Sequence, residues 1–170
     1  MYGDNAVSET KLAQGLFKNL PANSIIMADA AYGIFSTAYY AHQTGHNFVL
    51  RLTKDRFNRL HKNAELVDST GNSKSYQLQW TPSAKERATN PTLPADYVIT
   101  AKIHDLKIGD ESLYIVEDIG ASPKQLRDLY WKRNDIEVDI RNIMPITGQR
   151  EVVYSNAPAF VVYRRLTYKD

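Results

Sequence analysis

Residues 24–52 read SIIMADAAYGIFSTAYYAHQTGHNFVLRL, and this stretch decides the fold class. Its first part, Ser24 to Ala28, is a short apolar run that predicts a buried strand ending at Asp29. The spacing predicts a helix over Ile34 to Thr44 and a second strand over His46 to Leu52. A strand, a helix and a strand in this order favour a right-handed crossover between parallel strands, and therefore an α/β core.

The middle of the chain changes character. Short β-type runs alternate with turn signals between about residues 64 and 120; the runs are Ala64–Asp68, Ser75–Trp80, Ala95–Lys102 and Leu113–Glu117. This pattern predicts antiparallel hairpins inserted into the α/β chain, which is then a mixed α+β protein. The alternative is that these strands extend a single sheet.

Helix signals are present near both ends of the chain. Ser8 to Leu20 has helical spacing and is closed by a proline, and Ser122-Pro123-Lys124-Gln125 has the pattern of a helix start. Apolar residues then recur at helical spacing until Met144-Pro145, and two strand-like runs follow without strong organisation. The sequence therefore divides into segments 1–62, 63–120, 121–144 and 145–170.

Composition excludes several classes of function. The chain of 170 residues has no Cys and a net charge of +2, so thiolate chemistry is excluded and any nucleic-acid partner needs a local basic patch. Its four His residues show no metal-ligand spacing. The sequence shows neither an apolar run of about 18 residues nor a signal peptide, so we expect a cytoplasmic protein without membrane contact.

Two carboxylates are candidates for chemistry. Asp29 follows an apolar strand, where open α/β sheets place working residues, but the residue alone favours a turn or helix-capping role, which is typical of Asp. Glu137 shares one arc of the last helix with Tyr130 and Arg133, at the margin of the apolar stripe. A carboxylate there needs a partner. The simpler interpretation is a salt bridge from Glu137 to Arg133 beside a buried Tyr130.

Together, Asp29 and Glu137 have the chemistry to hold Mg²⁺, which takes one or two carboxylates plus substrate phosphates. A two-metal site normally needs a third acid, and Asp118, Asp135 and Asp139 qualify by residue type alone. Cations also gather after the second predicted strand; they are Arg51, Lys54, Arg56, Arg59 and Lys62. These cations favour contact with a phosphate backbone, and a solvated face is the alternative.

Three stretches resemble one known family. The helix segment LYWKRNDIEVDIRNI, residues 129–143, resembles the Y-x2-R-x3-E-x6-K signature of the insertion-sequence-four family of DDE transposases. The stretch LPANSIIMADAAYG, residues 20–33, resembles the second-Asp motif of that family, and FVLRLTK, residues 48–54, resembles its next strand. The resemblance covers roughly residues 1–143.

This resemblance implies a partial RNase H-like core with an inserted antiparallel β region, cutting and joining DNA at transposon ends. It implies a carboxylate triad with Mg²⁺ or Mn²⁺ as cofactor. Asp29 matches the second Asp and Glu137 matches the Glu, so both are implied metal ligands. Tyr130 and Arg133 match positions that face the DNA end, and we expect Arg51 and Lys54 to contact DNA as well.

The departures from the family are equally specific. The family's first Asp stands upstream of the matched residues, and Asp4 lies in a polar leader; the signature Lys position holds Met144, followed by Pro145. We therefore expect a chain truncated at its N-terminus, divergent after residue 143 and inactive alone. The alternatives are a non-catalytic DNA-binding relic and a two-carboxylate nuclease. Missing strands would leave an open sheet edge, which predicts either self-association or poor solubility unless the tail packs over it.

Overall fold

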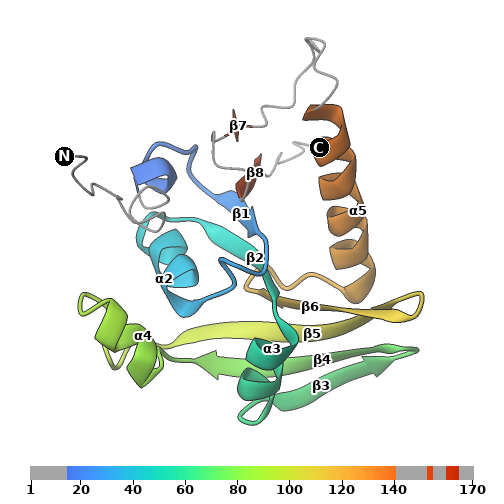
Figure 1. The fold of residues 1–170 in the computed structure, drawn as a ribbon, viewed down its shortest axis with the longest axis horizontal. Coiled ribbons are helices and arrows are strands. Elements are labelled where there is room, and N and C mark those ends of the chain that lie inside the picture. The colour runs from blue at the N-terminus through green and yellow to red at the C-terminus, as the bar shows by residue number, and fades with distance from the viewer. Residues whose placement is uncertain (1–14, 141–152, 155–159, 165–170) are drawn as a thin grey trace, which may run out of the picture.

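The computed structural model describes residues 15–140, 153–154 and 160–164, with side chains described for residues 15–131. It is a mixed α/β fold around one eight-stranded sheet of order β3-β4-β5-β6-β2-β1-β8-β7 (Figure 1). The strands are β1 (Ser24–Ala28), β2 (Asn47–Leu52), β3 (Glu65–Thr70), β4 (Ser73–Trp80), β5 (Ile99–Ile108), β6 (Glu111–Glu117), β7 (Val153–Tyr154) and β8 (Phe160–Arg164). The helices with assigned bounds are α2 (Phe35–Gln43), α3 (Lys54–His61), α4 (Ala84–Thr89) and α5 (Pro123–Ile140).

The predicted strand–helix–strand unit is confirmed. β1 and β2 pair in parallel, with Cα partners running from Ile25 and Asn47 to Ala28 and Leu50. Between them, α2 packs its buried residues over the sheet, and Gly45 follows its end with a φ of 76°. A positive φ is cheap for glycine, which explains why the helix stops here and turns into β2.

The four middle strands form consecutive antiparallel pairs, β3 with β4, β4 with β5 and β5 with β6. Their hairpin turns use Gly71 and Gly109, both with positive φ. β6 also pairs antiparallel with β2, so the middle strands continue the sheet of β1 and β2. The alternative interpretation of this region, extension of a single sheet, is therefore the one that the structure shows.

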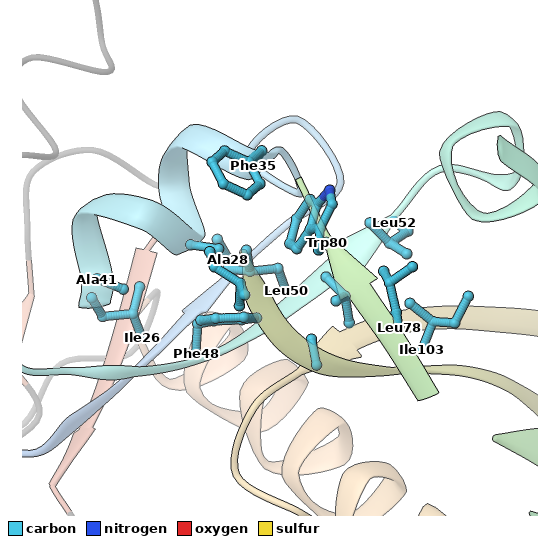
Figure 2. Close-up of a cluster of buried hydrophobic side chains, with 14 of the residues drawn as sticks. Ile26, Ala28, Phe35, Ala41, Phe48, Leu50, Leu52, Leu78, Trp80 and Ile103 are labelled. Carbon is cyan, nitrogen blue, oxygen red and sulfur yellow. The ribbon is translucent and has the colours of Figure 1, made fainter. Parts of the chain in front are cut away.

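The two faces of the sheet carry separate hydrophobic clusters. Alternate residues of β1 and β2, such as Ile26 and Leu50, pack with α2 in the larger cluster (Figure 2). The intervening residues, Met27 and Val49, pack in a second cluster with Leu126 and other residues of α5. Figure 1 shows α2 and α5 on opposite sides of these strands. We call this second cluster the α5-face cluster, and the side of the sheet that presents Met27 and Val49 the α5 face.

The edge beside β1 is covered, which differs from the expected open edge. β8 pairs antiparallel with β1 along its whole length, from Ser24 opposite Arg164 to Ala28 opposite Phe160. The strand-like run in the tail thus packs over this edge, as the alternative expected. β3 is the outer strand at the other end of the sheet, with Leu66 54% and Val67 49% exposed. Self-association stays a prediction.

Other boundaries differ in detail. The helix α4 was not predicted: it lies between the predicted runs Ser75–Trp80 and Ala95–Lys102, and it begins with a capping box between Ser83 and Glu86. The helix start at Ser122 is confirmed, because its side chain and that of Gln125 bond each other's backbone N–H groups. The helix predicted over Ser8–Leu20 is described only from residue 15, where residues 15–18 are helical. The predicted end at Met144-Pro145 lies outside the described residues.

Candidate functional site

Asp29 immediately follows β1 and is half-buried at the carboxyl end of that strand. Its Oδ1 accepts a hydrogen bond of 2.8 Å from the N–H of Ala31, and its carbonyl oxygen accepts one from the N–H of Tyr32. This is an Asx-type turn, the local role that Asp often plays. The turn interpretation of Asp29 is therefore present in the structure, and it leaves the carboxylate at the sheet end where ligands bind in α/β folds.

Arg51 is the second-last residue of β2 and follows Leu50, the Cα partner of Ala28, in the parallel pair of β1 and β2. Arg51 is exposed, and its Cα partner on β6 is Ile115, which belongs to the α5-face cluster. Partner residues on neighbouring strands point to the same face. The guanidinium of Arg51 therefore projects on the face that α5 covers.

The turn that carries Asp29 is held tightly from two sides. A Cβ on Gly33 would lie 1.9 Å from the carbonyl oxygen of Arg51, so the turn contacts β2 backbone to backbone. On the other side, the guanidinium of Arg56 in α3 donates a hydrogen bond to the carbonyl oxygen of Ala30. The position of Asp29 is thus fixed by β2 and by α3.

α3 is an amphipathic helix with a basic outer face. It begins at Thr53, whose Oγ1 accepts from the N–H of Arg56, and it buries Phe57 against the ring of Tyr114 at 4.6 Å. The exposed cations of this region are Arg51, Lys54, Arg59 and Lys62. Among the described side chains, no carboxylate forms an ion pair with any of them. Unpaired surface cations can contact phosphates without first breaking a bridge.

α5 contains the residues that resemble the family signature, and we call it the signature helix; its side chains are described only up to residue 131. Tyr130 is 8% exposed and packs in the α5-face cluster with Met27 and Val49, as expected for a residue at the core margin. Arg133 and Glu137 lie in α5 by their backbone, but their side chains are outside the described ones. The salt bridge between them and the metal role of Glu137 both stay predictions. The side chains of Asp135 and Asp139 also lie outside the described ones, so their candidate metal role stays a prediction.

Asp118 is fully engaged in holding the fold. Its carboxylate accepts from Asn47 Nδ2 at 3.2 Å and from the N–H of Phe48 at 2.8 Å, and it pairs with His42 Nε2 at 2.6 Å. Those partners occupy both of its oxygens. Within residues 15–131, no three His, Asp or Glu side chains are grouped closely enough to hold a metal ion.

In comparisons with known proteins, no family model, no curated protein and no solved structure matches the chain. In the described part of the chain, no helix combines the length and the apolar character that crossing a membrane requires.

Proposed function

We propose that this chain is part of a DDE transposase that cuts and joins DNA at insertion-sequence ends, in the cytoplasm, by metal-dependent phosphoryl transfer. The observation that carries the proposal is the placement of Asp29 and Arg51. Asp29 directly follows β1 and Arg51 is the second-last residue of the parallel strand β2. Arg51 projects on the face covered by α5, the helix that resembles the family signature. The 170 residues hold two of the three carboxylates that the resemblance implies, so we expect no cleavage by this chain alone.

In the proposal, Asp29 and Glu137 would hold a hard divalent cation, for which carboxylate oxygens are suitable ligands. Asp29 offers a half-buried carboxylate on a rigid turn, and Glu137 stands on α5 as the second oxygen ligand of the proposal. Such a metal would activate the attacking oxygen and stabilise the leaving oxygen of a phosphodiester. In the proposal the chain's own cations act separately from the metal: Arg51, in β2, and Lys54, at the start of α3, would hold the DNA backbone.

A non-catalytic DNA-binding domain is the second candidate function. Two observations favour it. Arg51, Lys54, Arg59 and Lys62 are exposed and form no ion pair among the described side chains, and one oxygen of Asp29 is already used within its own turn. Both candidates require DNA binding through the same cations, and they differ in whether a divalent cation binds at Asp29.

DNA binding through Arg51 and Lys54 is directly measurable. In a titration of an insertion-sequence-end duplex by fluorescence anisotropy, we expect the dissociation constant to rise steeply with salt. In a double variant, both Arg51 and Lys54 are replaced by Gln. The slope of the logarithm of the binding constant against the logarithm of the salt concentration should become smaller in magnitude by about two, and binding should weaken roughly tenfold or more, because two phosphate contacts are lost.

The matched control removes an equal charge from another surface. Lys85 and Arg87 are exposed on α4, and replacing both with Gln takes away one lysine and one arginine, as in the test variant. We expect the control to bind DNA within about twofold of the wild type, since distant surface cations add little beyond a Debye length. Equal losses in both variants, or salt-insensitive binding, would rule out DNA binding through Arg51 and Lys54.

A further inference from the structure

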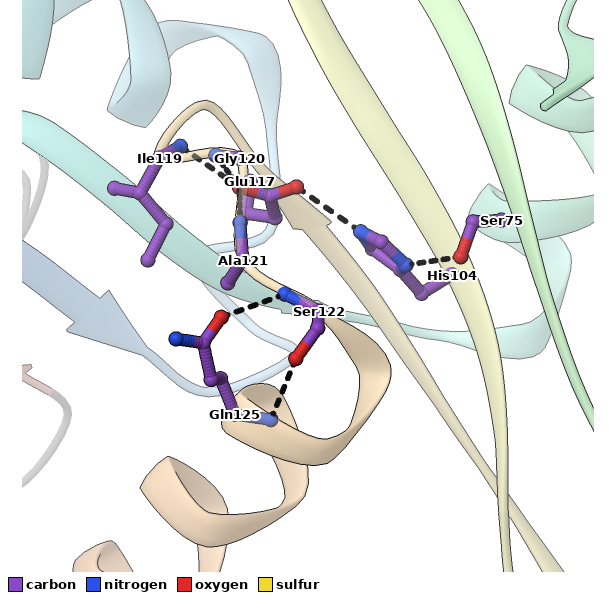
Figure 3. Close-up of polar contacts among 8 residues, drawn as sticks. All are labelled: Ser75, His104, Glu117, Ile119, Gly120, Ala121, Ser122 and Gln125. Carbon is purple, nitrogen blue, oxygen red and sulfur yellow. Dashed lines mark hydrogen bonds and ion pairs between the residues drawn. The ribbon is translucent and has the colours of Figure 1, made fainter. Parts of the chain in front are cut away.

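A buried carboxylate fastens the loop between β6 and α5. Glu117, the last residue of β6, is 0% exposed. Its Oε2 accepts from the N–H groups of Ile119 at 2.7 Å, Gly120 at 2.7 Å and Ala121 at 3.3 Å (Figure 3). Its Oε1 accepts from His104 Nε2 at 3.0 Å. A buried carboxylate is costly unless its lone pairs are satisfied, and here both oxygens have donors.

The network continues into the sheet through His104. Ser75 and His104 are Cα partners on β4 and β5, both are almost completely buried, and Ser75 Oγ lies 2.7 Å from His104 Nδ1. Because an ionised carboxylate only accepts, Nε2 must carry a hydrogen, and for a neutral ring Nδ1 then accepts from the Ser75 hydroxyl. The chain of bonds therefore has one direction, from Ser75 through His104 to Glu117.

A Ser–His–Glu set next to a cavity also suggests a hydrolase. A cavity of about 330 Å³ is lined by Ser75 and His104. Acyl transfer, however, needs free N–H groups to stabilise an oxyanion. The N–H groups of residues 119–121 are bonded to Glu117, and that of Ser122 is bonded to Gln125. The geometry therefore favours a fastening role over nucleophilic catalysis.

The loop that Glu117 holds sets the start of α5. The last amide that it binds is that of Ala121, which lies just before the helix begins at Pro123. Ala121 itself packs in the α5-face cluster with Leu126 and Tyr130. Fixing these amides fixes where α5 begins against the sheet. The start of α5 in turn determines where the later residues of the helix backbone lie, including residues 133 and 137.

We infer that Glu117 and His104 are positioning residues for α5: they hold the loop before the helix and so set where α5 begins against the sheet. The inference rests on the proposed function for its role in DNA binding. Its structural part, that Glu117 sets the start of α5, stands on the contacts above and has a readout that needs no DNA.

The neighbouring residue offers a matched control. Asp118 is also a carboxylate bonded to a histidine, with side chains 6% and 26% exposed in Asp118 and His42. Its bonds reach α2 through His42 and β2 through Asn47 and Phe48, whereas those of Glu117 reach the loop before α5. Removing either carboxylate costs a satisfied His–carboxylate pair, but only one of them holds the loop that starts α5.

The experiment compares Glu117→Ala, Glu117→Gln and Asp118→Ala in the full chain by amide hydrogen exchange and DNA titration. In Glu117→Ala, we expect exchange at residues 119–121 and in the first turn of α5 to rise about 10- to 100-fold, as for the loss of charge-assisted hydrogen bonds. Glu117→Gln should stay close to the wild type, because its amide oxygen can replace Oε2 and its NH₂ can face His104 in the other tautomer. Asp118→Ala is expected to lower the overall stability, which raises exchange throughout the chain. Beyond that global effect, the exchange rates of these amides should change by no more than about twofold.

The DNA arm uses a double-mutant cycle with Arg133→Ala. We expect Arg133→Ala to weaken binding in the wild type and in Asp118→Ala, and to have no further effect in Glu117→Ala, since α5 is then misplaced. If Glu117→Ala does not fold, His104→Ala takes its place in the hydrogen-exchange and DNA-titration experiments, because it removes only one of the donors to the same carboxylate. Unchanged exchange at 119–121, or equal α5 exchange in the Asp118 and Glu117 variants, would overturn the inference. A wild-type chain that does not bind DNA refutes the proposed function instead, while the exchange result still decides the positioning role.

Discussion

Replacing Gly33 with alanine is expected to lower the free energy of unfolding by roughly 3 kcal/mol, the upper range for overpacking a tight contact. The added Cβ would lie 1.9 Å from the carbonyl oxygen of Arg51, and 3.3 Å from a methyl group of Leu52. A backbone atom cannot move aside as a flexible side chain can, so the turn after Asp29 must lift from β2. Urea denaturation followed by circular dichroism measures the loss.

Gly15 provides the control for this substitution. It is helical and exposed, and a Cβ at this position would meet nothing within 4 Å. Gly15→Ala should therefore be neutral or stabilise the protein by up to about 1 kcal/mol, because alanine costs less backbone entropy in a helix. Equal stabilities for the two variants would mean that the Asp29 turn does not pack against β2 as described, and the rigid placement of Asp29 would be lost with it.

The second large effect is expected from Phe35→Ala, with a loss of about 3–5 kcal/mol for a fully buried aromatic residue. Phe35 opens α2 and is 0% exposed, and its ring meets that of Trp80 on β4 edge-on at 5.5 Å. It therefore links the first α/β unit to the middle strands. Because these strands share one sheet, we expect a single unfolding transition, shifted as a whole in the variant.

The measurement follows tryptophan fluorescence and far-UV circular dichroism during the same denaturant titration, and coincident curves indicate one cooperative unit. Trp131→Ala is the control, since Trp131 is 56% exposed and should change stability by no more than about 0.5 kcal/mol. Two separate transitions, with Phe35→Ala affecting only one, would instead show that residues 63–120 fold as an independent domain.

The parts of the fold that sequence alone predicted are those with local signals. β1, α2 and β2 follow from an apolar run, a helical period and a second apolar run within residues 24–52, and these elements are confirmed. The hairpins at Gly71 and Gly109 are also local, since a glycine between two β-type runs specifies a turn. α4 was missed although its Ser83–Glu86 capping box was readable in the sequence.

The pairing of distant strands had no local signal. Nothing in the residues of β6 shows that it pairs with β2, and nothing in those of β8 shows that it pairs with β1. Such contacts are chosen by the whole core, because many sheet orders satisfy the same alternation of apolar residues. The covered edge of β1 and the single sheet could therefore not be derived from the sequence.

The candidate site divides in the same way. Asp29 was predicted from its place after an apolar strand and Arg51 from a group of cations, but the parallel pairing of β1 and β2 was needed to place both at the same end of the sheet. Glu117 and His104 were missed because each looks like one polar residue within a strand. The turn at Gly109 would have found them, since its register sets His104 opposite Ile115, two residues from Glu117 on the same face.

The most direct test of the central claim is paramagnetic broadening by Mn²⁺ in the amide NMR spectrum of the full chain with an insertion-sequence-end duplex. The proposal predicts that Mn²⁺ broadens two groups of amides together, residues 29–31 and the residues around Glu137, because one ion lies between the two carboxylates. Asp29→Asn and Glu137→Gln should each remove both effects. Broadening that avoids Asp29, or that persists in both variants, would contradict a metal site built from these two carboxylates.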